Sequence, residues 1–239
     1  MYNNCVIINP TKKHHYSFIM LHPMCCDSSY FNDYINYFNN NFYNNRKNRN
    51  NRNNRNNTKV DNIKYILPES PIIDVDYPNN KQYNIKSWYN YYTCYNNLNK
   101  IDIIDVNQYN IESNNIVNII NNEALILGDF KKIFLLGVSQ GGTLLFNILN
   151  LCSKPLGGIF CIKSLYMYTH TNLNNNYKTP LYFYSGNKDE IYNLQLQKKS
   201  INILKKNYKV YWTIIKNLDH HTKIEEEFKF VWHYFFYSF

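Results

Sequence analysis

Short runs of apolar residues recur along the chain and alternate with stretches whose apolar residues are three or four positions apart. The runs contain few polar residues, which is typical of strands that are covered on both faces. They lie at residues 16–22, 63–68, 132–138, 157–163, 180–186 and 210–215. This alternation predicts an α/β fold with a mostly parallel central sheet and helices on both faces.

The intervening stretches show helical spacing. Ile116, Ile119, Ile120 and Ala124 define an apolar face within residues 111–125, and further helices are expected at 141–151, 191–207 and 225–237. Residues 39–58 break this order with "NNNFYNNRKNRNNRNNRNNT". This segment is too polar to pack, so we expect a disordered insert at about 39–58 within a single domain of residues 1–239.

Composition supports one medium domain, because 44% of the 239 residues are hydrophobic. The formal net charge of +9 raises the question of an anionic partner. The insert contains five basic residues and no acidic one, so without it the charge is 9 − 5 = +4. Basic residues elsewhere do not interleave with aromatic residues, and we therefore expect no nucleic-acid partner.

The cysteines and the apolar runs indicate a cellular location. Six cysteines lack the spacing of a zinc site, which favours free thiols in a reducing compartment and no metal or other cofactor. The first residues lack the apolar core of a signal peptide, and no apolar run is long enough for a transmembrane segment. We expect a cytoplasmic protein with at most transient contact with a membrane surface.

The sequence "GVSQGG" fits the pattern GxSxG and lies between an apolar strand and an apolar helix. A nucleophile elbow needs small residues beside its serine because the strand turns sharply into the helix. Gly137 and Gly141 supply that space. An ordinary glycine turn is the alternative interpretation, but the flanking elements favour Ser139 as a nucleophile.

A serine nucleophile needs a base and a carboxylate, which follow it in the order Ser, Asp, His in this kind of site. Asp189 lies in the loop after a strand, and His220 and His221 follow the last strand. Asp189 would otherwise cap the next helix, with Glu190 as an equally placed acid, and the histidines would be solvated loop residues. The joint order and loop placement favour a triad.

Several segments resemble the acyl-protein thioesterases, in the phospholipase/carboxylesterase group of α/β-hydrolases. They are "LHPMCCDSSYF", "VDNIKYILPESP", "IKSWYN", "GVSQGG", "YSGNKDEIYN" and "NLDHHTKIEEEF", and they run from about Phe18 to the C-terminus. The resemblance implies an α/β-hydrolase fold. Because no long insertion separates Ser139 from Asp189, we expect no separate cap domain.

The resemblance also implies roles for individual residues. Ser139 is then the nucleophile, Asp189 the triad acid and His220 the base. The oxyanion hole is formed by the backbone amides of Gln140 and Met24. Acyl transfer to water is the implied reaction.

The loop of Met24 departs from the pattern of that group. The group has Leu-His-Gly-Leu-Gly-Asp where this chain has "LHPMCC", so Pro23 and Cys25 replace both glycines. A residue with a Cβ adopts a positive φ only with strain, and proline fixes its own φ. If the Met24 amide were displaced, the rate would fall on the order of a hundredfold to a thousandfold.

Apolar residues near the predicted site are the candidates for substrate binding. Met24, Trp88 and Leu165 are expected to line an acyl channel, with a place in the core as the alternative. Lys163 and Met167 stand where the group has a small residue and a proline beside the acyl site, which implies a different substrate preference.

The implied function is hydrolysis of acyl thioesters, with S-acylated proteins as the substrates and partners. A carboxylesterase or lysophospholipase with the same triad, acting on acyl esters, is the first alternative. The second is a catalytically weak pseudoenzyme that serves as a binding module, because Pro23 and Cys25 alter the oxyanion loop.

Overall fold

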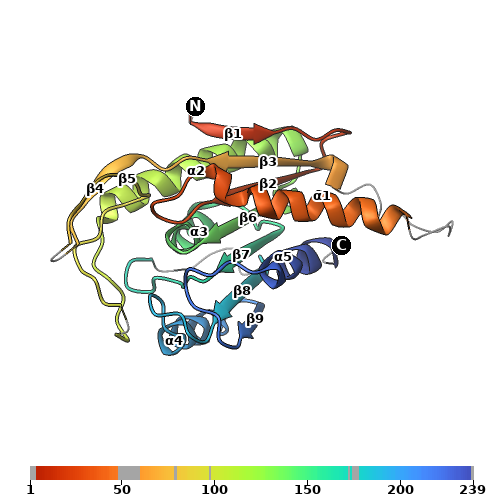
Figure 1. Cartoon of the computed structure of the whole chain (residues 1–239). Helices are drawn as coiled ribbons and strands as arrows, with labels where there is room; N and C mark the ends of the chain where they lie inside the picture. The colour runs from red at the N-terminus through yellow and green to blue at the C-terminus, as the bar shows by residue number, and fades with distance from the viewer. Residues whose placement is uncertain are drawn as a thin grey trace.

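The computed structural model describes residues 4–47, 60–77, 80–96, 98–171, 173 and 178–237 (Figure 1). Its centre is a seven-stranded sheet in the order β1-β3-β2-β6-β7-β8-β9. The strands are β1 (Cys5–Ile8), β2 (Tyr16–Leu21), β3 (Ile63–Pro68), β6 (Ile133–Val138), β7 (Gly158–Ile162), β8 (Leu181–Gly186) and β9 (Val210–Ile215). Only β1, at one edge, runs antiparallel to its neighbour.

Helices cover both faces of this sheet, as the alternation of strands and helices predicts (Figure 1). They are α1 (Asn32–Lys47), α2 (Val106–Leu127), α3 (Gln140–Leu151), α4 (Leu194–Leu204) and α5 (Glu225–Tyr237). Short 3₁₀ helices lie at η1 (Ser28–Phe31), η2 (Val60–Asn62) and η3 (Phe130–Lys132). The expected mostly parallel α/β fold is confirmed. None of the helices in the described ranges is both long and apolar enough to cross a bilayer.

The alternation of side chains along a strand divides the core into two layers. On β2, Phe18 and Met20 belong to the layer that includes residues of α1 and α5, whereas Ile19 and Leu21 belong to the layer that includes residues of α2, α3 and α4. Both layers are fully buried at these positions. This explains why the strand lacks polar alternation: each of its faces is covered by helices.

A second, two-stranded sheet lies outside the main one. It is formed by β4 (Ile72–Val75) and β5 (Gln82–Lys86), which pair antiparallel. Neither strand was expected from the sequence, and neither was β1. These strands are short and partly exposed, so their apolar runs are too brief to stand out from the polar background.

Helix α1 corrects the expected extent of the polar insert. The insert was predicted from residue 39, but α1 continues to Lys47. Phe31 and the α1 residues Tyr34, Ile35 and Phe38 form a buried helical face, and once a helix is nucleated each added residue gains a backbone hydrogen bond. Residues 48–58 of the predicted insert lie outside the described residues.

Aromatic packing joins the last helix to the centre of the sheet. The ring of Phe235, on α5, lies 5.1 Å from that of Phe18 and 4.7 Å from that of Phe134, measured between centroids. Phe235 is 1% exposed. The C-terminal helix is therefore an integral part of the core.

We predict that Phe235→Ala lowers the free energy of unfolding by about 3–5 kcal/mol, because it leaves a cavity among these rings. Leu125→Ala is the control, since Leu125 lies on α2 and is 83% exposed; its effect should stay within about 0.5 kcal/mol. Urea denaturation of both variants measures the difference. Equal effects would show that α5 does not contribute to the core in this way.

Candidate active site

Ser139 lies at a sharp turn between β6 and α3. Its φ is 51° and its ψ is −119°, a strained conformation for a residue with a side chain. A Cβ at Gly137 would lie 2.4 Å from the Gly141 carbonyl oxygen, and one at Gly141 would lie 2.3 Å from the Leu21 carbonyl oxygen. The glycines of "GVSQGG" are thus required by close backbone packing, as an elbow demands.

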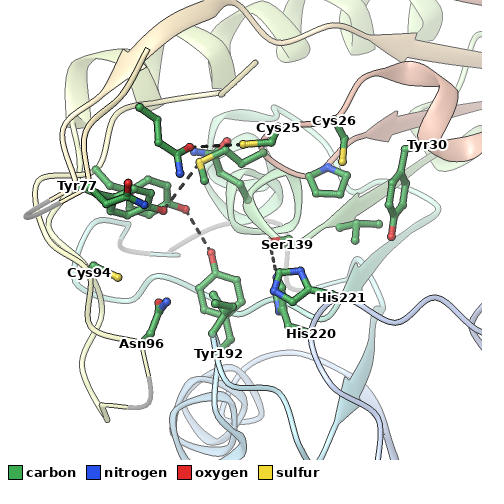
Figure 2. Close-up of a pocket in the computed structure, with 18 residues that line it drawn as sticks. Cys25, Cys26, Tyr30, Tyr77, Cys94, Asn96, Ser139, Tyr192, His220 and His221 are labelled. Carbon is green, nitrogen blue, oxygen red and sulfur yellow. Dashed lines mark hydrogen bonds between the residues drawn. The ribbon is translucent and has the colours of Figure 1, made fainter. Parts of the chain in front are cut away.

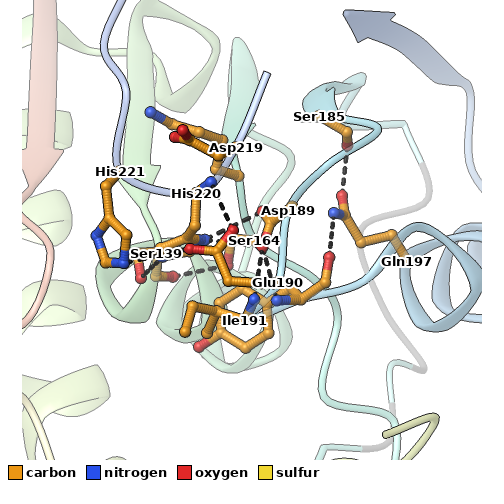
Figure 3. A network of polar contacts seen from close by, with 12 residues as sticks. Ser139, Ser164, Ser185, Asp189, Glu190, Ile191, Gln197, Asp219, His220 and His221 are labelled. Carbon is orange, nitrogen blue, oxygen red and sulfur yellow. Dashed lines mark hydrogen bonds and ion pairs between the residues drawn. The ribbon is translucent and has the colours of Figure 1, made fainter. Parts of the chain in front are cut away.

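The strand order brings three chemically important residues to one edge of the sheet (Figure 3). The Oγ of Ser139 is 2.8 Å from Nε2 of His220. On the other side of the ring, Nδ1 of His220 is 3.0 Å from each carboxylate oxygen of Asp189. In this arrangement Nδ1–H donates to the carboxylate and Nε2 accepts from the serine hydroxyl.

The alternative acid and base occupy different positions. The side chain of His221 is 76% exposed and its Nε2 lies 3.4 Å from the carboxylate of Glu190. Glu190 also accepts a hydrogen bond from the backbone amide of His220 at 3.3 Å. Neither His221 nor Glu190 is hydrogen-bonded to Ser139 in the described structure.

Asp189 is held by the loop that follows β8. Its Oδ1 accepts hydrogen bonds from the backbone amides of Ile191, at 3.0 Å, and Tyr192, at 2.8 Å. The carboxylate is buried, and the Tyr192 ring packs edge-on against His220 with centroids 5.6 Å apart. Sequence analysis did not identify Tyr192, because an aromatic residue in a loop gives no signal of its partner.

A close backbone contact joins the loops of Asp189 and His220. A Cβ at Gly186 would lie 2.1 Å from the carbonyl oxygen of Leu218. The amide of Lys188 donates to that same oxygen at 3.0 Å. Gly186 therefore allows the two loops to approach closely enough for the carboxylate to reach the imidazole.

Met24 and Gln140, whose backbone amides are the predicted oxyanion donors, both line the cavity that contains Ser139. Gln140 is the first residue of α3, and the first amides of a helix have no partner within it. The loop of Met24 adopts its conformation without glycine: Cys25 has a φ of 62°, and its amide donates to the Lys86 carbonyl at 2.8 Å. The positive φ at Cys25 is strain that this hydrogen bond helps to hold.

His22 stabilises the start of this loop. It is fully buried, its Nδ1 lies 2.7 Å from the Pro23 carbonyl, and its Nε2 accepts from the Ser70 amide at 3.1 Å. Burial lowers the pKa of His22, so the ring is neutral near pH 7 with its proton on Nδ1. The indole of Trp88 donates to the His22 carbonyl at 2.8 Å.

The side chain of Gln140 joins the elbow to the Ser87–Tyr89 segment. Its Oε1 accepts from the Trp88 amide at 2.9 Å, and its Nε2 donates to the Tyr89 carbonyl at 2.9 Å and to Ser87 Oγ at 2.9 Å. The amide group of Gln140 thus satisfies backbone and hydroxyl groups of the "SWY" segment, which gives the residue after Ser139 a structural role. Through Trp88, these bonds also connect Gln140 to the loop of Met24.

Trp88 and Leu165, expected to line an acyl channel or to belong to the core, are both buried in the core, and neither lines the cavity beside Ser139. Trp88 is fully buried between His22 and Gln140, so it supports the loop of Met24. Leu165 is 1% exposed and faces a separate small void. Apolar side chains near a site are often core residues, and sequence alone does not separate the two cases.

The cavity in front of Ser139 has a volume of about 500 Å³ (Figure 2). Aromatic, thiol and amide side chains line it, from segments far apart in the chain: Tyr30, Tyr77, Tyr91, Tyr192, Cys25, Cys26, Cys94, Asn80, Asn96 and Gln82. Its lining could not be predicted, since no local pattern marks these loops. Across the described residues, histidine, cysteine and acidic side chains form no group of three that would hold a metal.

Comparisons with known proteins agree with this fold. Among solved structures, SOBER1 of Arabidopsis thaliana is 18% identical with a TM-score of 0.74, covering 93% of this chain and 98% of its own. The Bacillus cereus carboxylesterase is 12% identical with a TM-score of 0.71, covering 98% of this chain and 94% of its own. Zea mays acyl-protein thioesterase 2 is 13% identical with a TM-score of 0.70, covering 98% of both chains.

No curated protein matches the sequence significantly. The sequence model described as phospholipase/carboxylesterase matches residues 50–237, which include Ser139, Asp189 and His220 but not the loop of Met24. The match spans well over half of the chain. The chain therefore belongs to the phospholipase/carboxylesterase family.

Proposed function

We propose that the protein hydrolyses acyl thioesters and esters, with Ser139 as nucleophile, His220 as base and Asp189 as the acid that orients it. The observation that carries this proposal is the continuous hydrogen-bonded path from the Ser139 hydroxyl through the His220 ring to the buried Asp189 carboxylate. Membership of a hydrolase family supports the same assignment.

The reaction follows from the geometry. His220 Nε2 takes the hydroxyl proton as Ser139 Oγ attacks the carbonyl carbon, and Asp189 stabilises the imidazolium that forms. The amides of Gln140 and Met24 donate to the oxyanion. The imidazolium then returns the proton to the leaving group as its bond breaks. A water molecule, deprotonated by the same imidazole, then attacks the acyl-serine, and the imidazolium returns this proton to Ser139 Oγ as the ester bond breaks and the acid leaves.

The conformation of the Met24 loop bears on whether the protein is an active enzyme or a pseudoenzyme. Cys25 takes the positive φ that a glycine would take, and Met24 lines the cavity, which supports the assignment of its amide to the oxyanion hole. The hydrogen bonds of His22 and Trp88 oppose its displacement. These contacts favour a working oxyanion hole in spite of the missing glycines.

Thioesters are the substrate class that we propose, and S-acylated proteins in the cytoplasm are their source. A thiolate has a pKa near 8.5, roughly that of free cysteine, and departs with little protonation. The cavity opens to solvent beside Ser139, which suits an acyl group presented on a protein surface. Small acyl esters are the second candidate, because an ester carbonyl undergoes the same attack by Ser139.

His220→Ala should reduce kcat/KM for a short aryl ester on the order of 10⁴-fold or more, because the serine loses its base. His221→Ala is the matched control, since its exposed ring pairs with Glu190 and lies edge-on to the His220 ring but makes no hydrogen bond to Ser139 or Asp189 in the described structure; we expect less than about a threefold change. Labelling of Ser139 by a fluorophosphonate probe should follow the same order. The reverse order would assign the base to His221.

Cys25→Gly tests the oxyanion loop directly. The substitution removes the Cβ at φ 62°, so it relieves local strain while it adds freedom to the unfolded chain; the unfolding free energy should change by no more than about 1 kcal/mol. We expect kcat/KM to change less than about threefold, because Cys25 already has the positive φ that glycine would adopt. A rise on the order of a hundredfold would show that Cys25 impairs the oxyanion hole.

The substrate class is measured by comparing a palmitoyl-cysteine peptide, a short-chain aryl ester and a lysophospholipid under the same conditions. We expect the palmitoyl thioester to be hydrolysed with the highest kcat/KM, and Ser139→Ala to abolish all three reactions. A preference for the short ester by orders of magnitude would assign a carboxylesterase instead. Absence of both turnover and fluorophosphonate labelling in folded protein would leave a binding module.

A further inference from the structure

A buried lysine lies behind the loop that carries His220. Lys163 follows β7, is 1% exposed and does not line the cavity, although the sequence resemblance placed it beside the acyl site. It also has a φ of 44°. Burial of a charge and a positive φ are each unfavourable for lysine, so specific partners must hold it there.

Those partners come from two other parts of the fold. The Nζ of Lys163 lies 3.1 Å from Oε2 of Glu227, on α5, and donates to the carbonyl oxygen of Thr222 at 3.0 Å. Glu227 is fully buried and accepts a hydrogen bond from the hydroxyl of Tyr34, on α1. Burial raises the pKa of Tyr34 well above its usual value, so this hydroxyl keeps its proton and donates.

Thr222 closes the turn in which His220 lies. Its amide donates to Oδ1 of Asp219 at 2.6 Å, and its hydroxyl donates to Oδ2 at 3.0 Å. Residues 219–222 are thereby held as one compact turn, with His220 inside it. The ammonium of Lys163 fixes the carbonyl end of that turn to the end of β7.

The adjacent residue on the same strand end holds the nucleophile. Ser164 Oγ donates to the Ser139 carbonyl at 2.7 Å, while the amide of Lys163 donates to the Tyr184 carbonyl of β8 at 2.8 Å. Two consecutive residues thus contact the backbone of Ser139 and the turn of His220. We propose that Lys163 is a positioning residue that fixes the His220 turn relative to Ser139, an inference that rests on the proposed function of this pair.

Stability alone does not explain a buried lysine here. A buried ion pair is often no more stabilising than apolar residues of similar size, because removing both charges from water costs as much as their attraction returns. Apolar residues would fill the space behind the loop equally well. They would not supply a donor to the Thr222 carbonyl, and that donor is what Lys163 adds to the active site.

The double variant Lys163→Met/Glu227→Gln removes the donor without leaving an unpaired buried charge. We expect its thermal midpoint to stay close to that of the wild type. For a short aryl ester, kcat should fall tenfold or more with KM nearly unchanged, because a base displaced by a fraction of an ångström misses the near-attack geometry. The rate of fluorophosphonate labelling of Ser139 should fall by the same factor.

Tyr34→Phe is the matched control. It removes the hydrogen bond to Glu227 but leaves the contact between Lys163 and Thr222. We expect a lower thermal midpoint with kcat unchanged. A double variant that keeps the wild-type kcat would overturn the inference, as would a Tyr34→Phe variant that loses kcat to the same extent.

Amide hydrogen exchange of residues 218–223 gives a measurement that does not depend on turnover. It should be at least tenfold faster in the double variant and unchanged in Tyr34→Phe. Unchanged exchange in the double variant overturns the positioning role. If the wild-type protein neither labels at Ser139 nor hydrolyses the ester, while exchange is still faster in the double variant, the proposed function is rejected and the structural contact of Lys163 is retained. If the double variant does not fold, Lys163→Gln/Glu227→Gln is judged by the same two measurements.

Discussion

The strained backbone of Ser139 is the constraint on which the rest of the site depends. A φ of 51° persists only because neighbouring groups hold the residue from several sides. Its amide donates to the Ile162 carbonyl at 3.0 Å, and its carbonyl accepts from the amide of Gly142 and from Ser164 Oγ. The turn between β6 and α3 is therefore held by the adjacent strand β7 as much as by its own sequence.

The topology of the sheet explains why the other residues converge on this turn. Parallel strands deliver their following loops to one edge, and β6, β7, β8 and β9 are consecutive neighbours. Asp189 follows β8 and His220 follows β9, so both loops leave the sheet on the side of Ser139. The close contact of Gly186 with Leu218 then brings the two loops within hydrogen-bonding distance.

Strongly apolar runs located the buried strands, and Gly137 and Gly141 marked the turn at Ser139, because both signals have direct physical causes. The choice of His220 over His221 came from the resemblance, since both histidines follow the last strand. The sequence missed β1, β4 and β5, whose residues are partly exposed and carry little pattern. It did not separate an acyl-channel position from a core position for Trp88, because both need the same kind of side chain. The contacts of Lys163 with Glu227 and Thr222 could not be predicted, because contacts between distant segments leave no local pattern in the sequence.

The side chain of Gln140 connects parts of the chain that are far apart in sequence. Its bonds to the Ser87–Tyr89 segment, and that segment's bond to the His22 carbonyl, join the turn at Ser139 to the start of the Met24 loop. Asn80, Cys94 and Asn96 also line the cavity and take part in none of these bonds. Substitutions at these three positions would therefore alter the cavity wall and leave the hydrogen bonds of Gln140 intact.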